Sequence, residues 1–247
     1  MAPTASLPEE QEAATDATEV TWRDRAVERS LRSARAKAMS RSDRFIEAAT
    51  EILSETGRTD FTVQELIERS KTSLRSFYQH FSGKEELLLA LFEEIITTSV
   101  VEWRAEIADL PDALSSLHLL LERIYSQAAA PVDGGGINRA LSVYHLQLAE
   151  SRPADYARVL APLRELILEL VQRGVDDGTF RRDIDPDTLA MIMMQTLVGA
   201  AHMHALGAQP SGVPLDAERL WEFCLGGLTG GVITAKSSRT GRGRRPA

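Results

Sequence analysis

Apolar residues recur along most of this chain at the spacing of an α-helix. In the first such segment Phe45, Ala48, Ala49, Ile52 and Leu53 fall at i, i+3, i+4, i+7 and i+8, which is one stripe of a helix. No segment alternates apolar and polar residues for long enough, with turn residues at both ends, to favour a strand. The pattern therefore predicts an all-α protein.

Nine helices are expected from these stripes and from the residues that break them. The expected ranges are 45–57, 62–69, 74–81, 82–108, 112–129, 136–150, 154–175, 187–206 and 216–235. Thr62 with Glu65 and Ser82 with Glu85 both fit a capping box at a helix start. Asp185 precedes a proline and predicts an N-cap for the eighth helix.

Charge is divided unevenly along the chain. The net charge of -8 argues against a protein that coats nucleic acid over its whole surface. Residues 86–235 carry 21 acids against 10 bases, whereas residues 21–85 carry 13 bases against 10 acids. The last twelve residues carry five bases and no acid, so the distribution of charge along the chain is more informative than the net charge.

The sequence predicts a cytoplasmic protein. Cys224 is the single cysteine, which excludes an internal disulfide and is compatible with a reducing compartment. The first 20 residues are acidic and polar, unlike a secretory signal, and no apolar run reaches the 18 residues of a membrane span. No membrane partner is expected.

Enzyme motifs are absent from the sequence. There is no HExxH, no phosphate-binding loop with its lysine and no GxSxG. His202 and His204 are two residues apart, so they project from different faces of a helix and cannot chelate one metal together. We expect neither catalysis, nor a metal, nor a cofactor.

Three short helices within the first part of the chain suggest a helix-turn-helix, which can offer one helix to the major groove of DNA. Residues 61–95, FTVQELIERSKTSLRSFYQHFSGKEELLLALFEEI, resemble the DNA-binding signature of the TetR family of bacterial regulators. The residues that keep the register of that signature are Ser73, Phe77, Tyr78, Phe81, Lys84, Glu85 and Leu87.

A second resemblance lies downstream, where residues 174–190, GVDDGTFRRDIDPDTLA, are similar to the loop before the eighth helix in many family members. The chain also departs from the family pattern: Lys71 and Thr72 replace Gly-Val in the turn, Arg75 and Ser76 replace Gly-Thr, and His80 replaces a common tyrosine. Lys71 would cost some stability if the turn needs a positive φ.

The third helix is expected to read DNA. Leu74, Phe77 and Phe81 are predicted to face inward, whereas Ser73, Arg75, Ser76 and Gln79 face away. Arg75 either grips a guanine bidentately or is merely solvated. By resemblance, phosphate contacts are expected from Thr62, Tyr78, His80 and Lys84. The predicted DNA-binding set is Thr62, Lys71, Thr72, Ser73, Arg75, Ser76, Tyr78, Gln79, His80 and Lys84.

Two late helices are expected to form a homodimer interface. The segment MIMMQTLVGAAHMHAL is apolar almost all round, and the last helix combines Trp221, Phe223 and Cys224 with four glycines. The alternative is that both helices lie in the centre of a monomer and form no interface. A two-fold dimer predicts a palindromic operator with half-sites about 34 to 36 Å apart.

The resemblance also implies that this larger part binds a small-molecule effector and that the protein is a repressor released by it. An apolar effector is expected, in a pocket between helices. The candidate lining residues are Trp103, His118, Tyr125, Tyr144, Gln147, Met194 and Gln195.

The expected organisation is a flexible extension at 1–40, a helix-turn-helix domain at 41–85, a ligand-binding and dimerisation domain at 86–235 and a basic tail at 236–247. The basic stretch from Arg23 to Arg44 either adds DNA contacts or is a solvated leader. The main alternative function is a helical carrier of a small molecule or lipid that uses the triplet only for packing and binds no DNA.

Overall fold

Helices make up all the regular structure that can be described. The computed structural model describes residues 39, 41–128, 135–208 and 215–230, and none of these residues is in a strand. The chain separates into residues 1–43 and residues 44–247, and the second unit contains every helix named here. The all-α prediction is confirmed.

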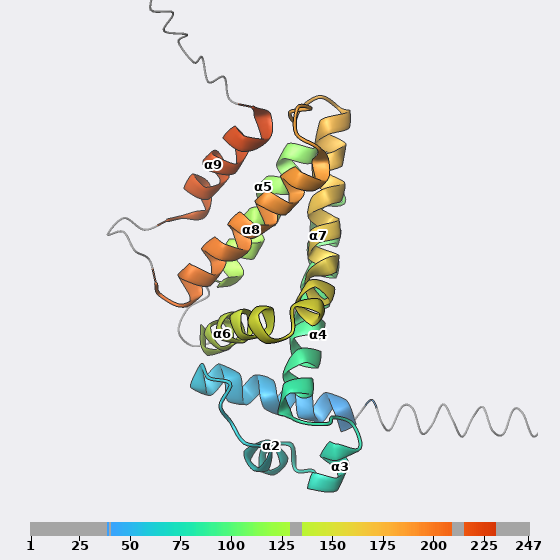
Figure 1. Cartoon of the computed structure of the whole chain (residues 1–247), viewed down its shortest axis with the longest axis vertical. Coiled ribbons are helices and arrows are strands. Elements are labelled where there is room, and N and C mark those ends of the chain that lie inside the picture. The colour runs from blue at the N-terminus through green and yellow to red at the C-terminus, as the bar shows by residue number, and fades with distance from the viewer. Residues whose placement is uncertain (1–38, 40, 129–134, 209–214, 231–247) are drawn as a thin grey trace, which may run out of the picture. The chain divides into compact units, whose positions relative to one another are not determined.

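Residues 44–56 of this unit are helical and form its first helix, which stops where Gly57 takes a φ of 64°. The helices that follow are α2 (Val63–Ser70), α3 (Leu74–Tyr78), α4 (Lys84–Ile107), α5 (Ala113–Ala128), α6 (Gly135–Ser151), α7 (Pro153–Asp176), α8 (Pro186–Ala205) and α9 (Ala217–Thr229). Figure 1 labels α2 to α9. Most bounds lie within a few residues of the predicted ranges, because breakers and caps mark them in the sequence.

Two of the three predicted N-caps are confirmed. The Thr62 side chain accepts from the Glu65 amide and Glu65 reaches back to the Thr62 amide, which completes the capping box of α2. The Asp185 carboxylate accepts the Thr188 amide at 2.9 Å and caps α8. These side chains satisfy backbone donors that have no partner within the helix.

The predicted capping box of Ser82 with Glu85 is wrong. The N-cap of α4 is Gly83, which has extended backbone and makes no side-chain cap, so the helix begins at Lys84. The amide of Ser82 donates instead to the Glu86 carboxylate, at 2.6 Å. The extended glycine places the serine one residue too early to cap the helix.

The predicted end of the last helix at residue 235 is also wrong. Gly230 takes a φ of 66° and its N–H donates to the carbonyl of Gly226, so α9 ends at Thr229. Only glycine adopts this left-handed conformation without steric cost, which makes it a frequent helix terminator. Residues 231–247 lie outside the described residues, as do residues 1–38, so the predicted extension and tail stay predictions.

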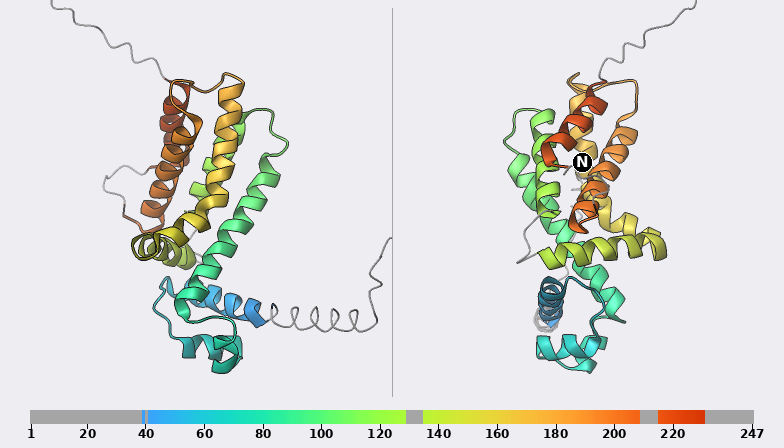
Figure 2. Two further views of the ribbon diagram at one scale, coloured as in Figure 1. Left: turned by 45° about the vertical axis from the view of Figure 1, so that its right-hand side comes forward. Right: turned by 90° about the vertical axis from the view of Figure 1, so that its left-hand side faces the viewer.

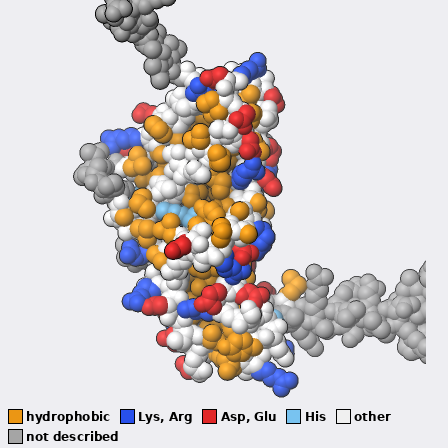
Figure 3. All heavy atoms as spheres, viewed as in Figure 1, with side chains coloured by type: hydrophobic (Ala, Val, Ile, Leu, Met, Phe, Trp, Pro, Cys, Tyr) orange, Lys and Arg blue, Asp and Glu red, His pale blue; other side chains and the backbone are white. Residues whose placement is uncertain are grey.

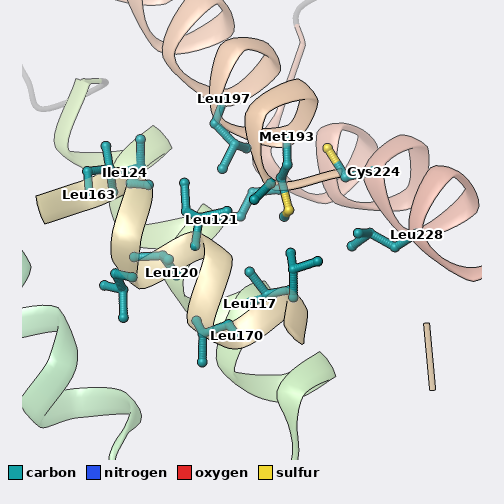
Figure 4. Close-up of a cluster of buried hydrophobic side chains, with 14 of the residues drawn as sticks. Leu117, Leu120, Leu121, Ile124, Leu163, Leu170, Met193, Leu197, Cys224 and Leu228 are labelled. Carbon is teal, nitrogen blue, oxygen red and sulfur yellow. The ribbon is translucent and has the colours of Figure 1, made fainter. Parts of the chain in front are cut away.

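The core consists of two hydrophobic clusters that share α4. The N-terminal cluster joins the first helix, α2, α3 and the start of α4 to parts of α6 and α7, with Phe45, Phe77 and Leu87 fully buried. The C-terminal cluster joins the rest of α4 to α5, α7, α8 and α9. Figure 4 shows side chains of α5, α7, α8 and α9 converging, among them Leu117, Leu121 and Met193.

α6 runs crosswise to α7 and α8 and contacts both (Figure 1, Figure 2). Near its start, Gly136 lies directly against the backbone of the first helix, because a Cβ built there would come within 2.2 Å of the Ser54 carbonyl oxygen. Any side chain at 136 would force the two helices apart. The larger helical part therefore reaches the N-terminal triplet through α6 as well as through α4. The predicted domain boundary at 85/86 stays a prediction.

Candidate functional site

The first helix, α2 and α3 form the N-terminal triplet of helices, and one face of α3 packs against the first helix. The ring of Phe77 meets the ring of Phe45 edge-on at a centroid distance of 5.5 Å, and Phe81 does so at 6.1 Å. Phe77 is fully buried and Phe81 is 6% exposed. Aromatic pairs in this arrangement contribute about 0.5–1.5 kcal/mol beyond burial of their area. The opposite face of α3 is therefore held outward by a rigid support.

The turn between α2 and α3 is strained at one residue. Lys71 takes φ 51° and ψ 44°, the left-handed region in which a residue with a side chain costs about 1 kcal/mol or more. Its amide donates to the Glu68 carbonyl and that of Thr72 to the Ile67 carbonyl, at 3.4 and 3.1 Å. The turn does take a positive φ at Lys71, and it places Lys71 on the surface shortly before α3.

The start of α3 is fixed by Ser73, whose hydroxyl accepts the Ser76 amide at 3.2 Å. Ser73, Arg75 and Gln79 are exposed, as predicted for side chains that face away from the core. Among the described residues no carboxylate pairs with Arg75, so its guanidinium is available to an outside acceptor. Ser76 and Thr72 are half-buried, and the Thr72 hydroxyl lies 2.7 Å from that of Ser70.

The prediction that Leu74 faces inward is wrong. Leu74 is 49% exposed. The stripe Leu74, Phe77, Phe81 assumed a helix through residue 81, but α3 ends at Tyr78, and Phe81 reaches the core from the segment after it. The rings of Phe77 and Phe81 fill the space against Phe45, so the Leu74 side chain is not part of the core.

The four residues expected at phosphates are Tyr78 at the end of α3, His80 just after it, Lys84 at the start of α4 and Thr62 at the N-cap of α2. Tyr78 is 57% exposed and stacks edge-on against Phe77. The ring Nδ1 of His80 lies 2.8 Å from the Ser76 carbonyl, which orients the ring. Lys84 opens α4 with its ammonium 5.6 Å from the centre of the Phe61 ring. The Thr62 hydroxyl already forms hydrogen bonds with the carboxylate and the amide of Glu65. It is therefore less available to a phosphate than the side chains of the other three residues.

Ion pairs join α2 to the first helix. Arg69 of α2 bonds the Glu55 carboxylate of the first helix at 2.6 and 2.7 Å. The same arginine lies 3.5 Å from Glu51, and it holds the pKa of Glu55 below its ordinary value. Exposed pairs of this kind contribute little to stability. Their effect here is to leave Arg69 neutralised, whereas Arg75 is not.

The seven residues predicted to line a ligand pocket lie on α4, α5, α6 and α8, and the pocket stays a prediction. Trp103, Tyr125 and Tyr144 are buried in the core. Met194 is half-buried between the two clusters. His118 is half-buried and stacks on Trp221 at 4.7 Å. Gln147 and Gln195 are exposed.

Two of the buried tyrosines are polar anchors between elements. The Tyr125 hydroxyl donates to the Leu215 carbonyl and lies 3.0 Å from Nδ1 of His204. The Tyr144 hydroxyl donates to the Glu85 carbonyl at 3.3 Å, which ties α6 to the start of α4. Burial raises the pKa of both phenols. These bonds explain the two tyrosines without a ligand.

Sequence reasoning missed a buried polar group between α6, α7 and α8. The Nε2 atom of His145 lies 2.7 Å from the Tyr156 hydroxyl, and its ring centre lies 4.0 Å from that of His202. Burial, together with His202, lowers the pKa of His145 to about 3, and burial lowers that of His202 as well. Both rings are therefore neutral at pH 7. Nothing in the sequence links these residues, because helix packing alone brings them together.

An apolar groove of about 480 Å³ lies between α8 and α9. Its lining includes Ile192, Met193, Phe223, Gly226 and Gly227. Ile192 is 51% exposed and Phe223 is 72% exposed, and Figure 3 shows hydrophobic side chains gathered on this face. Burial raises the pKa of the neighbouring Cys224 thiol to about 11, so it is not a nucleophile at neutral pH.

Within the described residues no helix is both long and apolar enough for a membrane span. Residues 45–91 match the family described as bacterial regulatory proteins, tetR family. The HTH-type transcriptional repressor KstR2 of Rhodococcus jostii (strain RHA1) is 24% identical over 188 residues, which cover 76% of this chain and 91% of the relative.

Solved structures share the fold. The fatty acid degradation regulator FadR from Bacillus halodurans has a TM-score of 0.61 at 22% identity, covering 75% of this chain and 98% of its own. The regulator FadR from Bacillus subtilis, solved with stearoyl-CoA, has a TM-score of 0.60 at 19% identity, covering 76% and 98%. The helix-turn-helix of residues 45–91, with its outward α3, therefore matches the tetR family of bacterial regulatory proteins, and the larger helical part shares the fold of the solved regulators.

Proposed function

We propose that this regulator is a homodimeric repressor that binds a palindromic operator through α3 and leaves it when an apolar small molecule binds. The observation that carries the proposal is the outward face of α3, on a helix fixed by Phe77 and Phe81. On this face Arg75 is exposed, and it has no carboxylate partner among the residues that the structure describes. A rigid helix with an unneutralised arginine at its N-terminal end suits direct reading of bases in the major groove.

The predicted contacts divide into two classes. Arg75 and Gln79 are the best candidates for base edges, since an arginine recognises guanine and a glutamine recognises adenine by paired hydrogen bonds. Lys71, Tyr78, His80 and Lys84 are the candidates for phosphates, which position the protein without specifying sequence. The remaining members of the predicted set would make contacts through backbone amides or hydroxyls. They are the N-caps Thr62 and Ser73, the turn residue Thr72, and Ser76 within α3.

The groove between α8 and α9 supports the homodimer. A Cβ at Gly226 or Gly227 would meet no atom within 4 Å, so the backbone of α9 is open to a close neighbour. Phe223 is 72% exposed and Ile192 is 51% exposed, and both line the groove. Contiguous exposed apolar surface marks an interaction site. A second copy related by a two-fold axis would cover this face and place two α3 helices on successive major grooves.

The effector is expected to be apolar and to bind in the larger helical part. Leucine and other aliphatic side chains dominate the interior there, with a few aromatic side chains and Met193 among them. The ligand seen in the Bacillus subtilis FadR structure, stearoyl-CoA, is a long-chain acyl thioester, and an apolar chain of that kind is consistent with this interior. A ligand can release the operator only by binding the released conformation more tightly than the DNA-bound one. Acting on the chromosome, the protein would work in the cytoplasm.

The proposal is tested by titrating the purified protein against DNA from upstream of its own gene at two salt concentrations, beside a scrambled duplex. A regulator binds the upstream DNA more tightly than the scrambled one, and more tightly at low salt than at high salt. Equal binding of both duplexes at low salt without ligand would favour a small-molecule carrier. Arg75→Ala is the matched variant, and it should reduce the preference while leaving salt-dependent binding.

A further inference from the structure

α3 presents one aliphatic side chain among polar ones. Leu74 is the first residue of the helix and is 49% exposed. Its neighbours Ser73 and Arg75 are both exposed and polar. One turn further along, the exposed Tyr78 lies on the same side, since residues four apart are neighbours on a helix surface.

Neither the core nor the helix start requires this leucine. The inward side of the segment is filled by Phe77 and Phe81 against Phe45. The helix start is set by the Ser73 hydroxyl. A side chain that could be polar without loss to the fold therefore exposes apolar surface to water at the position where reading helices contact base edges.

We propose that Leu74 packs against the 5-methyl group of a thymine in each half-site of the operator and so specifies a T·A base pair. The inference rests on the proposed DNA-binding function. Among the groups that base pairs present in the major groove, the thymine methyl is the apolar one, while the others donate or accept hydrogen bonds. A leucine offers no hydrogen bond, so the methyl is the feature it can recognise.

The position of this base pair follows from the helix geometry. Consecutive residues of a helix rise 1.5 Å, whereas consecutive base pairs rise about 3.4 Å. Leu74 and Arg75 are consecutive. They therefore reach the same or adjacent base pairs, and the T·A pair lies next to the G·C pair that Arg75 reads.

The test uses a duplex with the strongest-binding sequence selected from a random pool, in which each thymine is replaced in turn by uracil. Uracil lacks the methyl group and keeps the hydrogen-bonding edge. At one thymine of each half-site, replacement should weaken wild-type binding by about fourfold per half-site, as expected for one methyl group withdrawn from an apolar contact.

The variant Leu74→Ala should bind the thymine duplex more weakly and show no further loss on the uracil duplex. Leu146→Ala is the matched control, because Leu146 on α6 has the same exposed fraction of 49%. This control should lose affinity on the uracil duplex as the wild type does. Circular dichroism checks that both variants keep their helices, which the exposure of both leucines favours.

The outcomes separate the inference from the function on which it rests. If the wild type does not distinguish the selected duplex from a scrambled one, the proposed function fails and the inference with it. If it distinguishes them but no uracil position weakens binding, or Leu74→Ala suffers the same loss as the wild type, the role of Leu74 is overturned and DNA binding stands.

Discussion

Two exposed apolar surfaces of this protein differ in size and in neighbours. On α3, Leu74 and Tyr78 stand among exposed polar side chains that include Arg75. On α8 and α9, Ile192 and Phe223 border a groove of about 480 Å³ with apolar lining and glycines. The first surface suits a polar partner with isolated methyl groups, and the second suits another apolar helix. Exposure alone does not identify a partner, but the surroundings of the exposed residue do.

The largest effect is expected from breaking the α8–α9 surface. Phe223→Asp places a carboxylate in the proposed dimer interface twice, once from each copy, and burying an unpaired charge is very unfavourable. We expect monomers and operator affinity reduced on the order of 100-fold or more. Analytical ultracentrifugation and DNA titration measure the two effects.

Val101→Asp is the control for that substitution, because Val101 on α4 is 63% exposed and lies outside the groove. It should leave both the dimer and DNA binding unchanged. A Phe223→Asp protein that remains dimeric would show that the groove is not the interface.

The next effect in size is expected at Arg75 on the α3 surface. Arg75→Ala removes a bidentate guanine contact, which is worth about 1–3 kcal/mol of discrimination, so operator affinity should fall about 5- to 150-fold per half-site while binding to unrelated DNA changes little. Competition titration with operator and scrambled duplexes measures the ratio. Arg104→Ala, at an arginine paired with Glu169 on α7, should leave the ratio unchanged.

The interior between the two surfaces should be sensitive to acid. The folded pKa of His145 is about 3, below the ordinary 6.5, so between these values the unfolded chain binds a proton that the folded chain does not. The contribution of His145 to the free energy of unfolding is therefore greatest above pH 6.5. It decreases as the pH falls, by up to about 2 kcal/mol from pH 7 to pH 5.

Urea denaturation at several pH values checks this sign. His202 shifts in the same direction and adds to the slope. His145→Gln should flatten the slope, whereas His118→Gln, at the half-buried histidine that stacks on Trp221, should leave most of it. An unchanged slope in His145→Gln would mean that another group is responsible for the acid sensitivity.

The smallest effect is expected at Lys84. If its ammonium contacts a phosphate, Lys84→Ala weakens operator and scrambled DNA alike, about two- to threefold per copy, and lowers the slope of log affinity against log salt by about 1 per copy, or about 2 for the dimer. Titration of both duplexes over a salt series measures it. A loss confined to the operator would make Lys84 a base reader instead.

Local signals in the sequence predicted much of the fold. Helix stripes and caps depend on residues a few positions apart, so Thr62, Asp185 and the break at Gly57 marked boundaries that the structure confirms. The expectation failed where one local residue overrode the pattern. Gly83 is extended and delays α4, and Gly230 takes a left-handed conformation and ends α9 early.

The candidate site was predictable in part. The outward positions of Ser73, Arg75 and Gln79 followed from helix spacing. Leu74 did not, because the end of α3 at Tyr78 is set by packing of three phenylalanines that belong to different elements. The contact of His145 with His202 had no signal in the sequence, since the crossing of α6 and α8 alone determines it.

Selection of tight-binding duplexes from a random-sequence pool tests the central claim most directly, that a symmetric pair of α3 helices reads DNA. The enriched sequences should form an inverted repeat with half-site centres about one helical turn apart. The pool selected by Arg75→Ala should lose one G·C preference in each half. A pool without enrichment, or enriched sequences without two-fold symmetry that Arg75→Ala selects equally well, would contradict the account.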